Sequence, residues 1–164
     1  MYRVFLFISI ALVAAAAFVA LEVDHVLRAV HTKSTEATVP NKDLEPSVFY
    51  RQANGHFFVS AAVNGVEIKF LVDTGATNVI LNSRDASKLG FFPADEEFIW
   101  RYTSANGDGW AAPVQLDHVT VGQTHAWDVQ GAIIRAEMPS SLLGQSFLSK
   151  INGIEISGDR LSIY

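Results

Sequence analysis

The feature that most constrains this fold is a series of short segments in which apolar and polar residues alternate. His56–Val63 and Val66–Val72 have this two-residue period and flank Asn64-Gly65, the strongest short hairpin signal. Gln115–Val121 and His125–Ile134 predict a second hairpin across a glycine turn. Many short strands separated by turn residues are typical of a small β-barrel or sandwich. The sequence therefore predicts an all-β domain.

Two short helices and several further strands complete the predicted domain. The first helix starts after Asn82 or Ser83, either of which can cap it, and ends near Gly90. The second is predicted from Ser146 to Ile151, with Gln145 or Ser146 as its cap. Short strands are predicted at Thr77–Leu81, Ile154–Ile156 and Arg160–Tyr164.

The chain begins with an apolar run, Val4–Leu21, whose only polar residue is Ser9. A helix that crosses a bilayer needs about 17–25 apolar residues, whereas the apolar part of a cleaved signal peptide is about 7–15 residues long. We therefore expect residues 1–21 to be a transmembrane anchor. Ala15-Ala16-Ala17 offers a small-residue cleavage site, so a signal peptide remains the alternative.

The flanking charges predict the orientation of this anchor. Arg3 precedes the apolar run, and Glu22 and Asp24 follow it. The positive-inside rule then places the N-terminus in the cytoplasm. In a bacterium, the protein would be a single-pass inner-membrane protein with its domain on the periplasmic side. Residues 22–46 are predicted to be a polar linker and residues 47–164 the folded domain.

Composition excludes several classes of function. The chain has no cysteine, which excludes disulfides, thiolate catalysis and cysteine-ligated zinc. Its net charge is −5 without a basic stripe, so a nucleic-acid partner has no electrostatic support. The five histidines contain no closely spaced pair of the kind that binds metal. We expect neither a metal nor a cofactor.

The residues most suggestive of chemistry are Asp73-Thr74-Gly75, which follow the apolar strand end Phe70-Leu71-Val72. Gly75 allows a sharp turn that brings backbone amides close to the Asp73 carboxylate. Hydrogen bonds from such amides would fix that carboxylate. An ordinary turn between two strands is the alternative, but the longer apolar pattern is more specific than Asp-Thr-Gly alone.

Two other motifs accompany this one. Trp100–Trp110 predicts a hairpin with Asn106-Gly107 at its tip, which suits a mobile lid over a cleft. Leu142-Leu143-Gly144 precedes the second predicted helix. By itself, either motif would be an ordinary structural feature.

Together and in this order, the three motifs resemble those of the retropepsin-like aspartic proteases, especially the membrane-anchored bacterial branch. The matching segments are Asp73–Ala76, Ser104–Gly107 and Leu142–Leu148, with Ser104 where a threonine is expected. The resemblance covers residues 50–164 and the anchor. It implies a small closed β-barrel of the retropepsin type with one or two short helices, preceded by a single transmembrane helix.

The resemblance also implies roles for individual residues. Asp73 would be the catalytic acid, Thr74 would brace two active-site loops across a dimer axis, and Gly75 would shape the loop. Arg160–Tyr164 would add strands to a sheet between subunits. The implied substrate-binding residues are Ala76, Tyr102, Thr103, Ser104, Ala105, Asn106, Gly107, Leu143 and Gly144.

The chemistry of Asp73 requires a second carboxylate. One carboxylate acts as a base on water while the other, protonated, polarises the scissile carbonyl. The sequence has one Asp-Thr-Gly, and Asp108, Asp117, Asp128 and Asp159 lack its context. A two-fold homodimer would supply the partner. The expected function is an aspartic endopeptidase that cleaves envelope or periplasmic proteins or peptides.

Two alternatives belong to other classes. Ser146 with His118 or His125 could form a nucleophile and base, but Gly144–Leu148 lacks the second glycine of a nucleophile elbow. Alternatively, the domain is a catalytically inactive module that binds peptides or proteins at the membrane, since fold does not dictate function.

Overall fold

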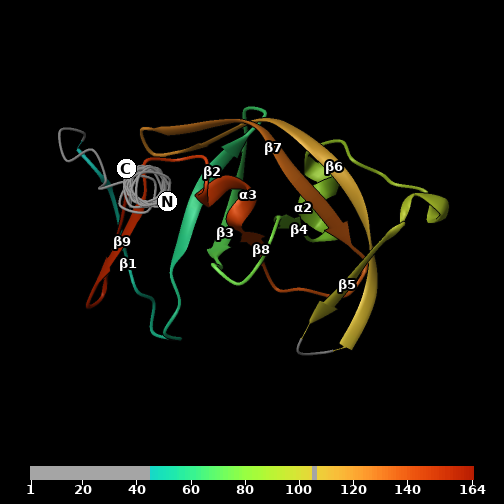
Figure 1. Ribbon diagram of the computed structural model, residues 1–164, viewed down its shortest axis with the longest axis horizontal. Coiled ribbons are helices and arrows are strands. Elements are labelled where there is room, and N and C mark those ends of the chain that lie inside the picture. Colours follow the sequence, from blue (N-terminus) through green and yellow to red (C-terminus); the bar gives the residue numbers. More distant parts are fainter. Residues whose placement is uncertain (1–44, 105–106) are drawn as a thin grey trace, which may run out of the picture. The chain divides into compact units, whose positions relative to one another are not determined.

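The computed structural model describes residues 45–104 and 107–164 (Figure 1). The predicted membrane span, the predicted linker up to Leu44, and Ala105 and Asn106 of the predicted lid lie outside the described residues. Among the described residues, no helix has the length and apolar character needed to cross a membrane.

The described part of the chain is dominated by short strands, as the alternating pattern predicted. The helical elements are α2 (Ser83–Lys88), α3 (Gln145–Leu148) and the 3-10 turn η1 (Asp95–Glu97). The strands are β1 (Ser47–Tyr50), β2 (Phe58–Val63), β3 (Val66–Val72), β4 (Val79–Leu81), β5 (Trp100–Ser104), β6 (Gly107–Val121), β7 (Thr124–Ile134), β8 (Ser141–Leu143), β9 (Ile154–Ser157) and β10 (Arg160–Ile163).

Six of these strands close into a barrel. They pair in the order β2, β3, β8, β4, β7, β6, and β6 returns to β2 through the pairs Ala62↔Thr120 and Val63↔Val119. Strand β5 pairs with the start of β6, on the same edge that β2 meets near the end of β6. The core includes Phe70, Leu116 and Phe147, which are each 0% exposed. The predicted all-β closed barrel with short helices is confirmed.

The β2–β3 hairpin forms as predicted, with Asn64 and Gly65 at φ 47° and 84°. Only residues that tolerate a positive φ suit both central positions of such a turn. Strand β2 begins at Phe58, two residues later than His56. The intervening segment is fixed by Arg51, whose guanidinium donates to the Gly55 and Gly158 carbonyls and lies over the Phe57 ring.

The two helices differ in how they begin. Asn82 caps α2, with its side-chain oxygen accepting from the Asp85 amide at 2.8 Å. Helix α3 has Gly144 at its N-cap position and no side-chain cap. The prediction of Gln145 or Ser146 as a cap, with a helix reaching Ile151, is therefore wrong. The first amides of α3 are bound by carbonyls of the loop after β3 instead.

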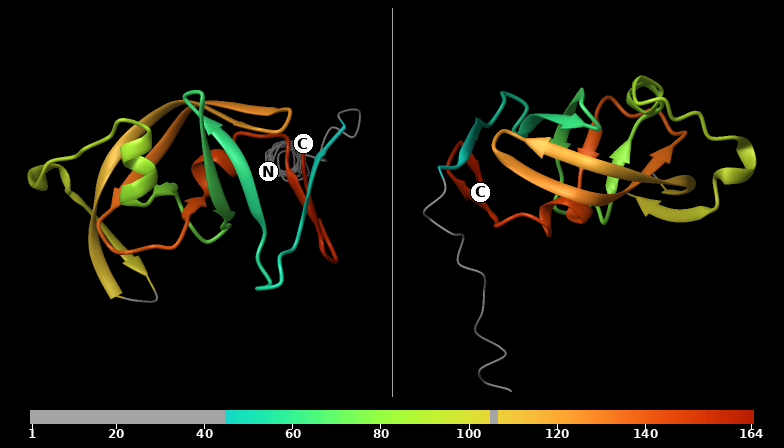
Figure 2. Two further views of the ribbon diagram at one scale, coloured as in Figure 1. Left: turned by 180° about the vertical axis from the view of Figure 1, so that it is seen from behind. Right: turned by 90° about the horizontal axis from the view of Figure 1, so that it is seen from above.

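A separate three-stranded sheet lies beside the barrel (Figures 1 and 2). In its order, β1-β10-β9, the C-terminal strand is central and pairs antiparallel on both sides within one chain. Residues 160–163 thus have no free edge in the single chain, and the part of Arg160–Tyr164 in a sheet between subunits stays a prediction. The free edges of this sheet belong to β1 and β9.

Candidate active site

Asp73 is the first residue after β3, and β8 fixes its position. Strands β3 and β8 run parallel with Val72 beside Leu143, and the Asp73 amide donates to the Leu143 carbonyl at 3.1 Å. The Gly75 amide donates to Asp73 Oδ1 at 2.9 Å. Asp73 is half-buried at the end of an apolar strand. An oriented carboxylate therefore sits where the sequence predicted one.

The loop that carries Asp73 is held from behind by the first turn of α3. The Gln145 and Ser146 amides donate to the Ala76 and Thr77 carbonyls at 2.8 and 2.9 Å. The first amides of a helix have no partner within it, so this loop supplies their acceptors. These two hydrogen bonds hold the loop against α3.

Gln145 is a site residue that sequence reasoning missed. Its side-chain Nε2 donates to the Thr74 carbonyl at 3.0 Å. The sequence offered one signal, since Gln145 directly follows the Leu-Leu-Gly motif, but its polarity suggested only a helix cap.

Ser146 is a structural residue in this fold. Its hydroxyl accepts from the Val79 amide at 2.9 Å and donates to the Gln130 carbonyl at 2.6 Å. The ring nitrogens of His118 and His125 lie 3.2 and 3.1 Å from Thr120 Oγ1. The Ser146 hydroxyl and the two histidine rings thus have other partners, which does not support a serine nucleophile paired with a histidine base.

Leu143 and Gly144 support the loop and are shielded from solvent. Leu143 is 0% exposed and Gly144 is buried, so both pack inside the chain, and their contact with substrate stays a prediction. A Cβ at Gly144 would lie 2.2 Å from the Asn78 carbonyl oxygen and 2.6 Å from that of Ala76. Only glycine fits at this close backbone approach. Thr74 and Gly75, in contrast, are exposed, and Ala76 is half-buried.

A buried polar network lies under the other end of β8. Ser141, at 0% exposure, donates to Asp85 Oδ2 at 2.8 Å and accepts from the Asn82 amide at 3.2 Å. Asp85 is 7% exposed and also forms an ion pair with Lys88 at 2.8 Å. The network ties α2 to the strand that positions Asp73. Nothing in the local sequence distinguished Asp85 from an exposed helical residue.

Strands β5 and β6 form the predicted flap-like hairpin, through pairs that include Tyr102↔Gly109 and Thr103↔Asp108. In Figure 1 the end of β5, the start of β6 and the β3–β4 loop point to the same, lower side. Tyr102 packs in a small apolar cluster with Ile80, the middle residue of β4. The hairpin base is thus joined to the strand that leaves the Asp73 loop.

One face of this hairpin carries a polar brace. The Asp108 carboxylate accepts from Thr103 at 2.7 Å and from Arg101 at 2.5 Å. These hydrogen bonds, the one from Thr103 first, lower the pKa of Asp108 from its usual 3.8. The Ser104 hydroxyl donates to the Gly107 carbonyl at 3.0 Å. The placement of Tyr102, Thr103, Ser104 and Gly107 thus matches a lid, although their contact with substrate stays a prediction.

The surface beside the flap is hollowed on both sides of Arg135. Two grooves of about 530 and 520 Å³ share Arg135 and Ala136, and neither is lined by Asp73. Arg135 pairs with Asp95 and lies 3.9 Å over the Phe98 ring. Within residues 45–104 and 107–164, no three acidic or histidine side chains are grouped to hold a metal ion.

Comparison with known proteins places the chain in a family. The family model described as "gag-polyprotein putative aspartyl protease" matches residues 59–150. Two curated relatives are each 40% identical: the uncharacterized protein RP867 of Rickettsia prowazekii, over 114 residues, and an uncharacterized protein in the cobV 5' region of a Sinorhizobium species, over 118 residues. These matches cover 70% and 71% of this chain but only 49% and 50% of the relatives, so the chain spans about half their length.

Solved structures agree with this placement. A retropepsin-like aspartic protease from Rickettsia conorii matches with a TM-score of 0.66 and 37% identity, over 73% of this chain and 89% of that one. EIAV protease, solved with the inhibitor HBY-793, matches with a TM-score of 0.52 over 65% of this chain and 97% of that one. Its 13% identity shows a shared fold only. The chain therefore belongs to the retropepsin-like aspartic protease family.

Proposed function

We propose that this protein is an aspartic endopeptidase that works as a homodimer in which each copy supplies Asp73. The observation that carries this proposal is the Asp73 loop. The half-buried Asp73 carboxylate accepts a hydrogen bond from the Gly75 amide, and β8 and α3 hold the loop in place. We further propose that residues 1–21 anchor the enzyme in a bacterial inner membrane. Its substrates would be envelope or periplasmic proteins.

In the proposed reaction, one Asp73 carboxylate takes a proton from a water molecule, which attacks the peptide carbonyl carbon. The Asp73 of the second copy, protonated, donates to the carbonyl oxygen. As the tetrahedral intermediate collapses, the second carboxylate takes a proton back from one of its hydroxyl groups, the C–N bond breaks, and the amine leaves with the proton that the first carboxylate took from water. Two carboxylates at such close range share one proton, so their opposite roles follow from electrostatic repulsion.

The surface of the single chain is consistent with a site that a second copy completes. The sequence contains no second Asp-Thr-Gly, and Asp85 is engaged in a buried network. Neither of the two grooves beside Arg135 is lined by Asp73. A cleft made of two halves would be open in one chain. No observation favours the alternative of an inactive peptide-binding module, because the Asp73 loop is intact.

The catalytic role is tested by comparing the wild type with Asp73→Asn in cleavage of an unfolded protein at acidic and neutral pH. Loss of the ionisable group should lower activity by about 10²–10⁴-fold, the usual range for acid–base catalysis. Asp117→Asn is a matched control, because Asp117 is an exposed aspartate on β6. Equal activity of the wild type and Asp73→Asn would exclude this mechanism.

Subunit mixing tests whether both copies contribute. If each active site needs two Asp73 side chains, an equal mixture of wild type and Asp73→Asn should retain only about a quarter of the wild-type activity after exchange. Retention of half would show that each copy acts by itself.

A further inference from the structure

The peptide unit between Thr74 and Gly75 is bound at both of its ends. Its carbonyl oxygen accepts from the side-chain Nε2 of Gln145 at 3.0 Å. Its N–H, which belongs to Gly75, donates to Asp73 Oδ1 at 2.9 Å. The peptide bond is trans, so the unit is planar and its C=O and N–H point in opposite directions. One rigid group therefore links the side-chain amide of Gln145 to the carboxylate that the proposed reaction uses.

Gln145 also holds the loop on the other side of Gly75. The backbone amide of Gln145 donates to the Ala76 carbonyl at 2.8 Å, and the Ala76 amide donates to the Asp73 carbonyl at 3.3 Å. A Cβ at Gly75 would lie 3.2 Å from Asp73 Oδ1, so the carboxylate lies directly against this glycine. Gln145 thus binds the loop both before and after the residue whose amide donates to Asp73.

The hydrogen bond from the Gln145 side chain determines how the Gly75 amide is aimed. Within residues 45–104 and 107–164, no other group donates to the Thr74 carbonyl. Without that bond, the peptide unit would be free to rotate and to turn its N–H away from the carboxylate. A hydrogen bond at a peptide carbonyl also polarises the N–H of the same unit and strengthens its donation. The Gln145 side chain therefore acts on both the direction and the strength of the Gly75 hydrogen bond.

The exposure of Gln145 separates this role from a contribution to overall stability. Gln145 and Thr74 are both exposed in the single chain. Holding a glutamine side chain in one rotamer costs about as much free energy as one exposed hydrogen bond returns. The contact therefore adds little to the free energy of unfolding, and its effect lies in the orientation of the loop.

We propose that Gln145 is a positioning residue for Asp73, whose carboxylate it orients through the Thr74–Gly75 peptide unit. This inference rests on the proposed aspartic endopeptidase and adds a residue to its machinery. A hydrogen bond to an ionised carboxylate favours the charged form, so a well-aimed Gly75 amide supports the carboxylate that acts as the base on water. Removal of the Gln145 donor should therefore slow the chemical step and leave substrate binding unchanged.

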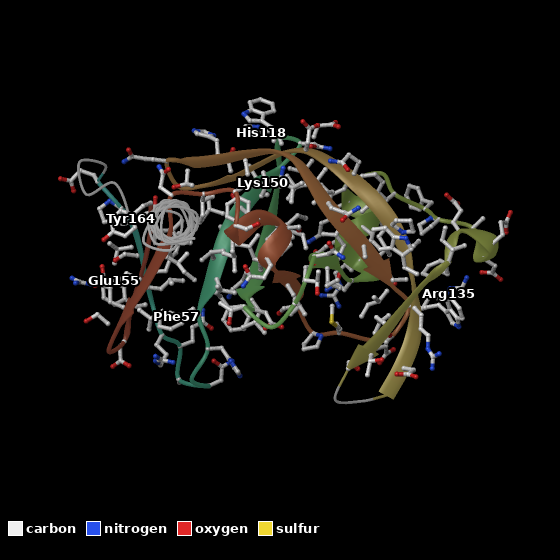
Figure 3. All side chains as sticks on the ribbon, in the orientation of Figure 1. Phe57, His118, Arg135, Lys150, Glu155 and Tyr164 are labelled. Carbon is white, nitrogen blue, oxygen red and sulfur yellow. The ribbon has the colours of Figure 1, made fainter. Side chains whose placement is uncertain are left out.

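Two substitutions at position 145 separate the hydrogen-bond donor from the shape of the side chain. Gln145→Met keeps the length but has no donor, and both variants keep the backbone amide that binds Ala76. Gln145→Glu can only accept when it is ionised, whereas its protonated form regains an O–H donor. Glutamic acid ordinarily titrates near about pH 4.3, so acidification restores a donor that Gln145→Met cannot regain. Lys150→Met is the matched control, because Lys150 is exposed beyond the other end of α3 (Figure 3).

Cleavage of an unfolded protein by the full-length enzyme, measured across acidic and neutral pH, is the first readout. Gln145→Met should lower kcat roughly tenfold, the change that one lost hydrogen bond produces, with kcat/KM lowered equally. Gln145→Glu should match Gln145→Met at neutral pH and approach the wild type below about pH 4.3. Lys150→Met should keep the wild-type kcat, and urea unfolding midpoints should agree among all of these proteins. Wild-type kcat in Gln145→Met, or equally low activity of both position-145 variants at every pH, would overturn the inference.

The amide resonance of Gly75 gives a second readout that does not depend on activity. In the ¹⁵N-labelled full-length protein in detergent, the Gly75 amide proton should move upfield in Gln145→Met as its hydrogen bond weakens, and stay in place in Lys150→Met. An unchanged Gly75 resonance in Gln145→Met would overturn the inference even if the rate falls. Equal cleavage by the wild type and Asp73→Asn would refute the proposed protease, and the Gly75 resonance would then decide by itself whether Gln145 positions the Asp73 carboxylate.

Discussion

At Gly144 the backbone of one motif passes almost against the backbone of another. The position follows Leu143, whose carbonyl binds the Asp73 amide, and it faces the Ala76 and Asn78 carbonyl oxygens. A side chain there would have to displace backbone rather than a flexible neighbour. Gly144 therefore acts on Asp73 through the shape of the loop.

We predict that Gly144→Ala destabilises the domain by about 1–3 kcal/mol, the usual cost of overpacking, and strongly lowers proteolytic activity. Urea unfolding and cleavage of an unfolded substrate would measure the two effects. Gly158→Ala is the control, because Gly158 has φ +58° and no atom within 4 Å of an added Cβ. It should cost about 1–2 kcal/mol for its backbone conformation while leaving activity intact. Wild-type activity in Gly144→Ala would contradict the role assigned to this glycine.

At the scale of elements, the predicted flap hairpin is held together by side-chain hydrogen bonds between its two strands. Arg101, Thr103 and Asp108 are exposed, so the brace acts at the surface of the hairpin, where salt and pH reach it. Strand β5 pairs only with β6, which leaves one edge of the hairpin without a strand partner in the described residues. The brace is thus a local means to keep the two strands in register.

We predict that the flap hairpin loosens in acid. The pKa of Asp108 in the folded chain is lower than 3.8. Its ionised carboxylate therefore stabilises the hairpin fully above about pH 3.8, and this stabilisation is lost as the pH falls through the pKa of the folded state. Amide hydrogen exchange along the β5–β6 ladder would show this loss. Asp108→Asn should remove the pH-dependent part, and Asp117→Asn, also on β6, should leave it unchanged. A wild-type ladder equally protected at pH 2 and pH 5 would contradict the prediction.

At the scale of the whole molecule, the proposed anchor and the proposed dimer depend on each other. Tethering two copies in one membrane would raise their effective concentration. The described residues, 45–104 and 107–164, contain a hydrophobic core of their own, so the domain can be studied without the anchor.

We therefore predict that the anchor-free unit, residues 40–164, is a weaker dimer than the full-length protein. Sedimentation of the unit over a range of concentrations, compared with cross-linking of the full-length protein in vesicles, would measure the difference. A tight dimer of the anchor-free unit would contradict this dependence on the membrane.

Local sequence was sufficient for most of the elements and for the position of the candidate catalytic residue, Asp73. The Asn64-Gly65 turn, the Asn82 cap and the strand that delivers Asp73 depend on neighbours a few residues away, so pattern and propensity predict them. Gln145 and Asp85 could not be found in this way. Their partners, Thr74 and Ser141, are 71 and 56 residues away in the chain.

The sequence by itself determined that the chain forms short strands and turns, and that a carboxylate emerges from an apolar strand end. Only the tertiary structure decided that β6 closes the barrel on β2, that β8 lies between β3 and β4, and that β10 lies between β1 and β9. Strand partners are selected by the shared burial of apolar faces across long loops, a condition that no local segment contains.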